Sequence, residues 1–313
     1  MPPMKLSDVI LRPFVQLSTW DGVSFGQLAN GFGFITTTSQ SVREGFFRHA
    51  DDLGDDAWIE HVQKTIGMKT SSDSEHEFFP LNLPPGSYFP RMARPHHHHP
   101  GDFPTNYSQA FNTERAAAIV QIVSLTDWLS RCLVVVESDP RNMQVFGNEF
   151  RNILILASTE FEAQAKGVLR ANYYTSSRND GRWTTADFVK LEPALRLADY
   201  IIDFPRFPQL PMQRPFEGWT TDQPTSSLGW YDAYNQVKHD RERHFEKASL
   251  SNALAAVSGV VVICLAQFGI SILRESRILG EMFNIKVRPW WCSGDTHGAD
   301  GIGGQAINYP FST

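Results

Sequence analysis

Hydrophobic side chains recur with helical spacing through the middle and later parts of the chain. Four stretches carry this pattern, at residues 113–137, 141–173, 228–247 and 248–278, and each is long enough for several turns of helix. In the second stretch the apolar positions lie three or four residues apart, which places them on one helix face. They are Phe146, Phe150, Ile153, Ala157, Phe161, Ala165 and Val168. The pattern predicts a mainly α-helical bundle.

The two ends of the chain have a different pattern. Residues 1–108 are rich in Gly, Pro, Ser and Asp, with a strand-like piece at 32–35 and near-helical spacing within 41–68. Residues 282–313 contain glycine-rich turns. We therefore expect three parts: an irregular N-terminal extension with short helices at 1–108, a helical bundle at 109–281 and a loop-rich tail at 282–313, with little β-structure.

Between the second and third helical stretches the chain is rich in proline. Thr184 or Thr185 is expected to cap a short helix that runs to Ala198. Residues 200–202 have the composition of an edge strand. The aromatic residues of 215–219 are expected to pack against the side of the bundle.

One stretch raises the question of a membrane. Residues 253–272 are twenty residues without a charge, the length of a bilayer span. The stretch contains Ser258 and Gln267 and follows an amphipathic helix, which favours the central helix of a bundle. The first residues of the chain lack the apolar segment of a signal peptide. We therefore expect a cytoplasmic protein without a membrane span, in which Cys132 and Cys264 are small buried hydrophobes.

Composition limits the classes of function. Hydrophobic residues make up 42% of the chain and charged residues 20%, which is ordinary for a globular protein with a sizeable core. The formal net charge of −6 argues against a broad nucleic-acid-binding surface. A local basic patch is compatible with that charge. Residues 238–247 contain four Lys/Arg and three Asp/Glu.

Two clusters contain metal-ligand residue types. His96–His99 are four consecutive imidazoles in a Pro-rich connector, residues 71–104, and imidazole is a good ligand for Zn, Ni and Cu. Asp295, His297 and Asp300 offer two carboxylates and an imidazole in six residues. Consecutive residues point in different directions, and loops of such composition are common, so we interpret both clusters as loops. No glycine-rich phosphate loop or nucleophile motif occurs, and no cofactor is expected.

The reactive side chains gather in residues 230–247. On a helix, Asn235 and His239 share a face, with Glu242 and Arg243 one turn further on. An apolar stripe lies opposite, formed by Trp230, Tyr234, Val237 and Phe245. One interpretation is a solvated helix face with local charge pairs.

Residues 234–239, Tyr-Asn-Gln-Val-Lys-His, resemble the motif of the HEPN superfamily of small helical domains. The family motif is an Arg and a His separated by four to six residues, usually with a polar residue directly after the Arg. The chain keeps the spacing, the polar Asn235 and His239, and has Tyr234 in place of the Arg. Residues 230–241 also look similar to uncharacterised bacterial proteins. The resemblance implies a HEPN-like helical bundle.

In HEPN proteins that cleave RNA, two motifs meet across a homodimer axis and no metal is needed. The resemblance implies that His239 and Asn235 act on the 2′-hydroxyl, because imidazole can take up a proton near neutral pH. A tyrosine hydroxyl cannot replace the forked guanidinium that holds the phosphate. Lys238, Arg241 or Arg243 would have to supply that positive charge.

Three functions remain open on this evidence. The first-ranked hypothesis is a non-catalytic or weakly active HEPN-like module that binds RNA, a nucleotide or a protein partner, in a toxin or phage-defence setting. The loss of the motif Arg at Tyr234 and the negative net charge favour it. The alternatives are a metal-independent HEPN ribonuclease and a purely structural helical dimer. The resemblance implies a homodimer with its motif helices near the two-fold axis.

Overall fold

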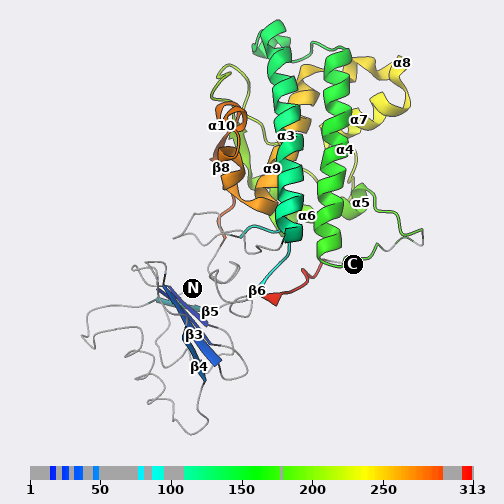
Figure 1. The fold of residues 1–313 in the computed structure, drawn as a ribbon. Coiled ribbons are helices and arrows are strands. Elements are labelled where there is room, and N and C mark those ends of the chain that lie inside the picture. The colour runs from blue at the N-terminus through cyan, green and yellow to red at the C-terminus, as the bar shows by residue number, and fades with distance from the viewer. Residues whose placement is uncertain are drawn as a thin grey trace. The chain divides into compact units, whose positions relative to one another are not determined.

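The computed structural model (Figure 1) describes residues 15–18, 23–27, 32–37, 45–48, 77–80, 87–94, 109–176, 178, 180–291 and 305–311. The chain divides into two compact units. The first comprises residues 1–88, 94–100 and 290–307, and the second comprises residues 89–93, 101–289 and 308–313. The second, called the helical unit below, contains all of the described helices.

The first unit contains a five-stranded antiparallel sheet in the order β4-β3-β2-β1-β5. The strands are Val15–Ser18 (β1), Val23–Gln27 (β2), Phe32–Thr37 (β3), Gly45–Arg48 (β4) and Glu77–Pro80 (β5). The strand expected at 32–35 is confirmed. Phe46 and Phe47, expected in a helix, lie in β4 instead. Aromatic residues favour strands when a neighbouring strand is available, and a count of helical spacing does not reveal that neighbour.

Two smaller features complete the described part of the first unit. Ser87–Tyr88 (β6) pairs in parallel with Gln305–Ala306 (β9). The Arg94 guanidinium stacks on the Trp291 ring, 4.3 Å from the ring centroid.

The helical unit confirms a mainly α-helical fold. Its longer helices are Gln109–Val135 (α3), Asn148–Ala171 (α4), Gly229–His239 (α7) and Leu250–Phe268 (α9). The shorter ones are Pro140–Asn142 (η1), Thr185–Phe188 (α5), Leu191–Leu195 (α6), Leu197–Asp199 (η2), Arg241–His244 (α8), Phe245–Lys247 (η3), Ile270–Arg274 (η4) and Arg277–Met282 (α10). Of the two predicted caps, Thr184 is the one observed, because it forms a capping box with Asp187. The single helix expected to run to Ala198 is wrong, since this stretch is divided into α5, α6 and η2.

The core of the helical unit is α9, which is buried along most of its length and packs most extensively on α4 (Figure 1). The Ser249 hydroxyl caps its N-terminus by accepting from the backbone N–H of Asn252, 3.3 Å away. The helix ends at Gly269, whose φ of 85° favours glycine. It is therefore shorter than the predicted 248–278.

By length and composition, α3 and α9 could each cross a membrane. In α9, however, 83% of the most apolar window is buried inside the unit, against 44% in α3. The core helix of a bundle passes the same test of length and composition. The prediction that 253–272 forms a central bundle helix therefore agrees with the burial of α9.

Helix α4 begins seven residues later than predicted. Residues 143–147 form a turn followed by a non-helical stretch that pairs with the start of α9: Phe146 bridges Ser249, and the Leu250 backbone N–H donates to the Val145 carbonyl, 2.8 Å away. This pairing takes backbone groups that a helix would otherwise use. It also places the N-termini of α4 and α9 side by side.

A short strand pair and an aromatic loop cover the helices. Ile201–Asp203 (β7), the predicted edge strand, pairs antiparallel with Asn284–Val287 (β8). Phe216 and Trp219 are buried, and their rings contact the Phe161 ring on α4 at 5.7 and 5.9 Å between centroids. The prediction that residues 215–219 pack against the bundle is confirmed.

Candidate functional site

The sequence motif lies on α7, which is fixed to the unit through its aromatic face. Trp230, Tyr234 and Val237 are buried, as the helical spacing predicts. The Trp230 indole donates to the Pro215 carbonyl, 2.8 Å away. Gly259 on α9 lets that indole approach, because a Cβ there would lie 2.9 Å from a ring carbon. The position of α7 is therefore set by its core face.

Tyr234, at the position of the family's Arg, belongs to the core. Its side chain is only 2% exposed, and its ring lies 5.3 Å from that of Tyr231. Its hydroxyl accepts a hydrogen bond from Lys238 Nζ, 2.9 Å away, and this bond raises the pKa of Lys238. The Tyr234 hydroxyl and the Lys238 ammonium group thus form a hydrogen-bonded pair where the core meets the surface.

The motif helix ends at His239, so the prediction of one continuous helix over 228–247 is wrong. Asp240 leaves the helical region (φ −142°, ψ 72°), and its Oδ1 accepts from the Arg243 backbone N–H to cap α8. Asp is a favoured N-cap residue. By capping α8, Asp240 starts a new helix, although the apolar spacing continues as if there were one. Glu242 and Arg243 consequently do not continue the face of Asn235 and His239.

Asn235 and His239 share one face of α7, one turn apart, as predicted. Asn235 is half-buried, and His239, the last residue of the helix, is exposed. Within the part of the chain that the structure describes, no hydrogen bond or ion pair orients the His239 imidazole. A general base needs such a partner to fix its tautomer and direction.

Of the arginines predicted to accompany His239, Arg241 lies on an aromatic ring and Arg243 pairs with a carboxylate. The Arg241 guanidinium stacks on the Phe245 ring, 5.4 Å from its centroid, and Phe245 packs edge-to-face on Phe146 at 5.7 Å. Phe146 is 51% exposed. Arg243 is exposed and forms an ion pair with Asp240, 3.6 Å apart. We call Phe146, Lys238, His239, Arg241, Arg243 and Phe245 the α7–α8 surface.

An apolar hollow of about 520 Å³ adjoins this surface at the turn between α3 and α4. Phe146 and Val145 line it, together with Val135 from the end of α3. Val134 and Val135 are largely exposed. The end of the unit that carries the motif thus combines cations with exposed apolar side chains.

A second polar group, in the core, was not predicted. The Arg91 guanidinium donates through Nε to Gln267 Oε1 (2.8 Å) and through Nη2 to Gln164 Oε1 (2.7 Å). Its Nη1 lies 3.4 Å from Glu114 Oε2, and Gln164 in turn donates to Glu160, 2.6 Å away. We call these five residues the Arg91 cluster. It joins residues 89–93 to α3, α4 and α9.

Arg91 is 9% exposed and has a left-handed backbone, with φ of 57°. Burial lowers its pKa, and the carboxylate of Glu114 partly opposes that shift. The guanidinium packs against Gly167, where an added Cβ would lie 2.0 Å from Nη1. Arg91 lies within residues 71–104, which the sequence pattern predicts as a connector. The available signals were Gln267 in an uncharged run and Gln164 among apolar neighbours.

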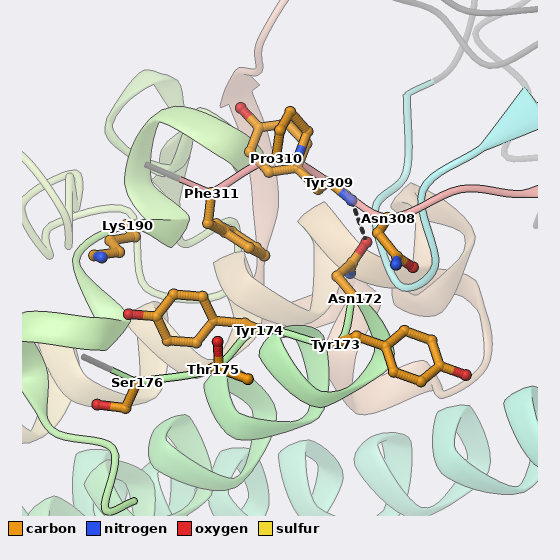
Figure 2. A pocket seen from close by; sticks show the side chains of 10 residues that line it. All are labelled: Asn172, Tyr173, Tyr174, Thr175, Ser176, Lys190, Asn308, Tyr309, Pro310 and Phe311. Carbon is orange, nitrogen blue, oxygen red and sulfur yellow. Dashed lines mark hydrogen bonds between the residues drawn. The ribbon is translucent and has the colours of Figure 1, made fainter. Parts of the chain in front are cut away.

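A pocket of about 420 Å³ lies beyond the C-terminus of α4 (Figure 2). It is lined by Asn172, Tyr173, Tyr174, Thr175, Ser176, Lys190, Asn308, Tyr309, Pro310 and Phe311. The Tyr174 hydroxyl donates to Asp187 Oδ1, 2.9 Å away, and burial together with this bond raises the pKa of Tyr174 to about 12. Nothing in the local sequence predicted this pocket, because its walls come from segments over 130 residues apart.

No group of three or more His, Cys, Asp and Glu side chains suited to a metal occurs among the residues that the structure describes. His96–His99, Asp295, His297 and Asp300 lie outside those residues. Cys132 and Cys264 are buried free thiols, as predicted, and burial raises the pKa of both.

Comparisons with protein-family models, with curated proteins and with solved structures find no match to this chain. What the chain does is therefore inferred from its own residues.

Proposed function

We propose that the helical unit is a HEPN-like module that has lost RNA-cleaving activity and binds single-stranded RNA at the α7–α8 surface. The observation that carries the loss of activity is the burial of Tyr234. Its hydroxyl is bonded to Lys238, so neither residue reproduces a guanidinium that grips a phosphate. His239 has no orienting partner within the described residues.

RNA is favoured as the ligand by the mixture of rings and cations. Single-stranded RNA is bound by aromatic rings that stack on its bases and by Lys and Arg that contact its phosphates. Phe146 presents half of its surface to solvent, and the Arg241 guanidinium stacks on its partner ring, Phe245. Arg243 is exposed two residues further along α8. The local excess of positive charge is small, so we expect micromolar, strongly salt-dependent binding.

The resemblance also implies a homodimer, which we retain as part of the proposal. Two copies related by a two-fold axis near α7 would bring two α7–α8 surfaces together and lengthen the RNA-binding track. Sedimentation velocity at tens of micromolar measures this directly. A monomer at that concentration would contradict the dimer and leave the RNA surface of one chain to be tested by itself.

The test of the module uses the full chain and a fluorescein-labelled 20-nucleotide single-stranded RNA in EDTA. We expect intact RNA and an anisotropy increase that weakens with salt. The double variant Arg241→Ala/Arg243→Ala should bind about tenfold more weakly, with a salt slope lower by up to about 1.4, since each phosphate contact contributes about 0.7. The control, Arg214→Ala/Arg277→Ala, removes two other exposed arginines, each paired with a nearby glutamate, and should bind as the parent does.

Two outcomes contradict the proposal. Cleavage to a 2′,3′-cyclic phosphate that disappears in His239→Ala would establish the ribonuclease instead. An absence of salt-sensitive RNA binding would exclude RNA and favour a protein partner at the apolar hollow beside Phe146.

A further inference from the structure

The pocket beyond α4 has walls that the fold holds in place. The Asn172 side chain is buried; its oxygen accepts from the Tyr309 backbone N–H (3.0 Å), and its amide donates to the Pro90 and Val168 carbonyls (both 2.9 Å). This one side chain therefore fastens residues 308–311 to the end of α4 (Figure 2). Because these walls are already held in place, the protein loses less conformational entropy when a ligand binds.

Aromatic rings form much of the lining. Phe311 packs edge-to-face on Tyr174 at 5.5 Å and on Tyr309 at 4.9 Å between ring centroids. The Tyr174 ring cannot turn freely, because Asp187 holds its hydroxyl and the Thr184 backbone N–H holds the other carboxylate oxygen of Asp187 at 2.7 Å. The lining thus provides fixed faces and edges for a flat ligand.

Tyr173 supplies an open face at the rim. It is 80% exposed, has a left-handed backbone with φ of 53°, and points away from Tyr174 in Figure 2. A left-handed residue directly after the C-cap is a common way for a helix to end, and here the Tyr173 and Tyr174 N–H groups bond the Arg170 and Leu169 carbonyls. An exposed ring held in that conformation is available for stacking.

The charge of the lining is positive. Lys190 is the only charged residue among the ten that line the pocket, and its Nζ lies 5.1 Å from the Tyr174 ring centroid. The C-terminal carbonyls of α4 carry partial negative charge, but backbone N–H groups of residues 172–174 already bond three of them, those of residues 168–170. Thr175, Ser176 and Asn308 add neutral groups that can donate or accept hydrogen bonds.

We propose that this pocket binds a planar aromatic anion of the size of a nucleoside monophosphate. Its volume lies in the range of small-ligand sites. The base stacks on the open aromatic face of Tyr173, and Lys190 attracts the phosphate. This site is separate from the α7–α8 surface, because the 24-residue helix α4, about 36 Å long, lies between them.

Isothermal titration calorimetry of the full chain with AMP, adenosine and inorganic phosphate tests the proposal. We expect AMP to bind about tenfold more tightly than adenosine and than phosphate. Lys190→Met should remove the advantage of AMP over adenosine. Tyr173→Ala should weaken both nucleoside ligands about tenfold, as loss of one base–aromatic stack does.

The matched controls are Lys286→Met and Trp290→Ala, an exposed lysine and an exposed aromatic residue that are not among the lining residues, and both should bind AMP as the parent does. No detectable AMP binding at 1 mM would overturn the proposal. So would AMP binding that both Tyr173→Ala and Lys190→Met leave unchanged, or phosphate binding as tight as that of AMP. RNA binding at Arg241 and Arg243 is measured with different variants, so either site can fail without the other.

Discussion

The Arg91 cluster and the α7–α8 surface are both built around arginine, yet they are constructed in opposite ways. Arg91 is buried, and each of its three guanidinium nitrogens lies close to a side-chain oxygen on a different helix. Arg243 is exposed and pairs with Asp240 three residues away, on the same turn. Removing the hydrogen-bond donor of buried amides is far more costly than breaking an exposed ion pair. The comparison indicates that the first cluster holds the fold and that the second is free to bind.

The largest effect is expected from Arg91→Ala. It removes the donors to Gln164 and Gln267 and leaves both amides buried without a cation, so the free energy of unfolding should fall by about 3–5 kcal/mol. Arg243→Ala, the matched change at the α7–α8 surface, should alter it by less than about 0.5 kcal/mol. Urea denaturation followed by circular dichroism measures both. Equal losses would show that the two clusters do not differ as described.

A smaller loss, about 2 kcal/mol, is expected from Gly167→Ala, because its Cβ would overlap the Arg91 guanidinium. Gly147→Ala is the control, since nothing lies within 4 Å of a Cβ there. In an Arg91→Ala background, Gly167→Ala should cost almost nothing. The double-mutant cycle therefore isolates the contact, and additive losses would argue against it.

Asp187 extends the comparison to pH. Burial alone would raise its pKa, but hydrogen bonds from the Thr184 backbone and the Tyr174 hydroxyl outweigh burial and lower it. A lowered folded-state pKa contributes stability above the unfolded value near 4, and this contribution is lost as pH falls through the folded pKa. Asp187→Asn should therefore cost about 1–2 kcal/mol at pH 7 and progressively less below pH 4.

Thermal melts of the parent and of Asp187→Asn between pH 2.5 and 7 measure the difference in stability between the two proteins. The exposed Asp222, changed to Asn, is the control and should show little difference at either pH. A difference that grows as pH falls would contradict the assignment.

The smallest effect is expected from Tyr234→Phe. The ring stays in the core, and the variant loses only the hydrogen bond from Lys238, which lies where the core meets the surface. The free energy of unfolding should therefore fall by about 0.5–1 kcal/mol. The RNA affinity should not change, because the proposal places no phosphate at the tyrosine hydroxyl. A marked fall in affinity, measured by anisotropy, would mean that the hydroxyl contacts RNA.

The sequence predicted the elements whose cause is local. Helix α9 follows from an uncharged run, and the cap at Thr184 follows from residue type. The ends of the helices were harder to predict, because Asp240 and Gly269 end α7 and α9 by adopting non-helical backbone conformations that hydrophobic spacing does not reveal. On the motif helix, the shared face of Asn235 and His239 and the burial of Tyr234 followed from helical geometry.

The Arg91 cluster and the pocket beyond α4 could not be predicted in the same way. Arg91 lies in a Pro-rich stretch, and its partners Gln164 and Gln267 are 73 and 176 residues away. The positions of Gln267 and Gln164 among apolar neighbours indicate buried amides, but they do not indicate which residue bonds them. Long-range polar contacts of this kind depend on the tertiary arrangement, which no local pattern contains.

The separation of Arg91 and Gln267 along the sequence also determines when their hydrogen bond can form during translation. Arg91 is synthesised 176 residues before the amide that accepts its Nε proton, and at 5–20 residues per second this takes roughly 9–35 s. During that interval the nascent chain has the guanidinium and α3, then α4, but lacks α9, the helix on which α4 packs most. Closure of the unit is thereby tied to the synthesis of α9. A ribosome stalled before residue 267 should hold a chain that remains sensitive to protease.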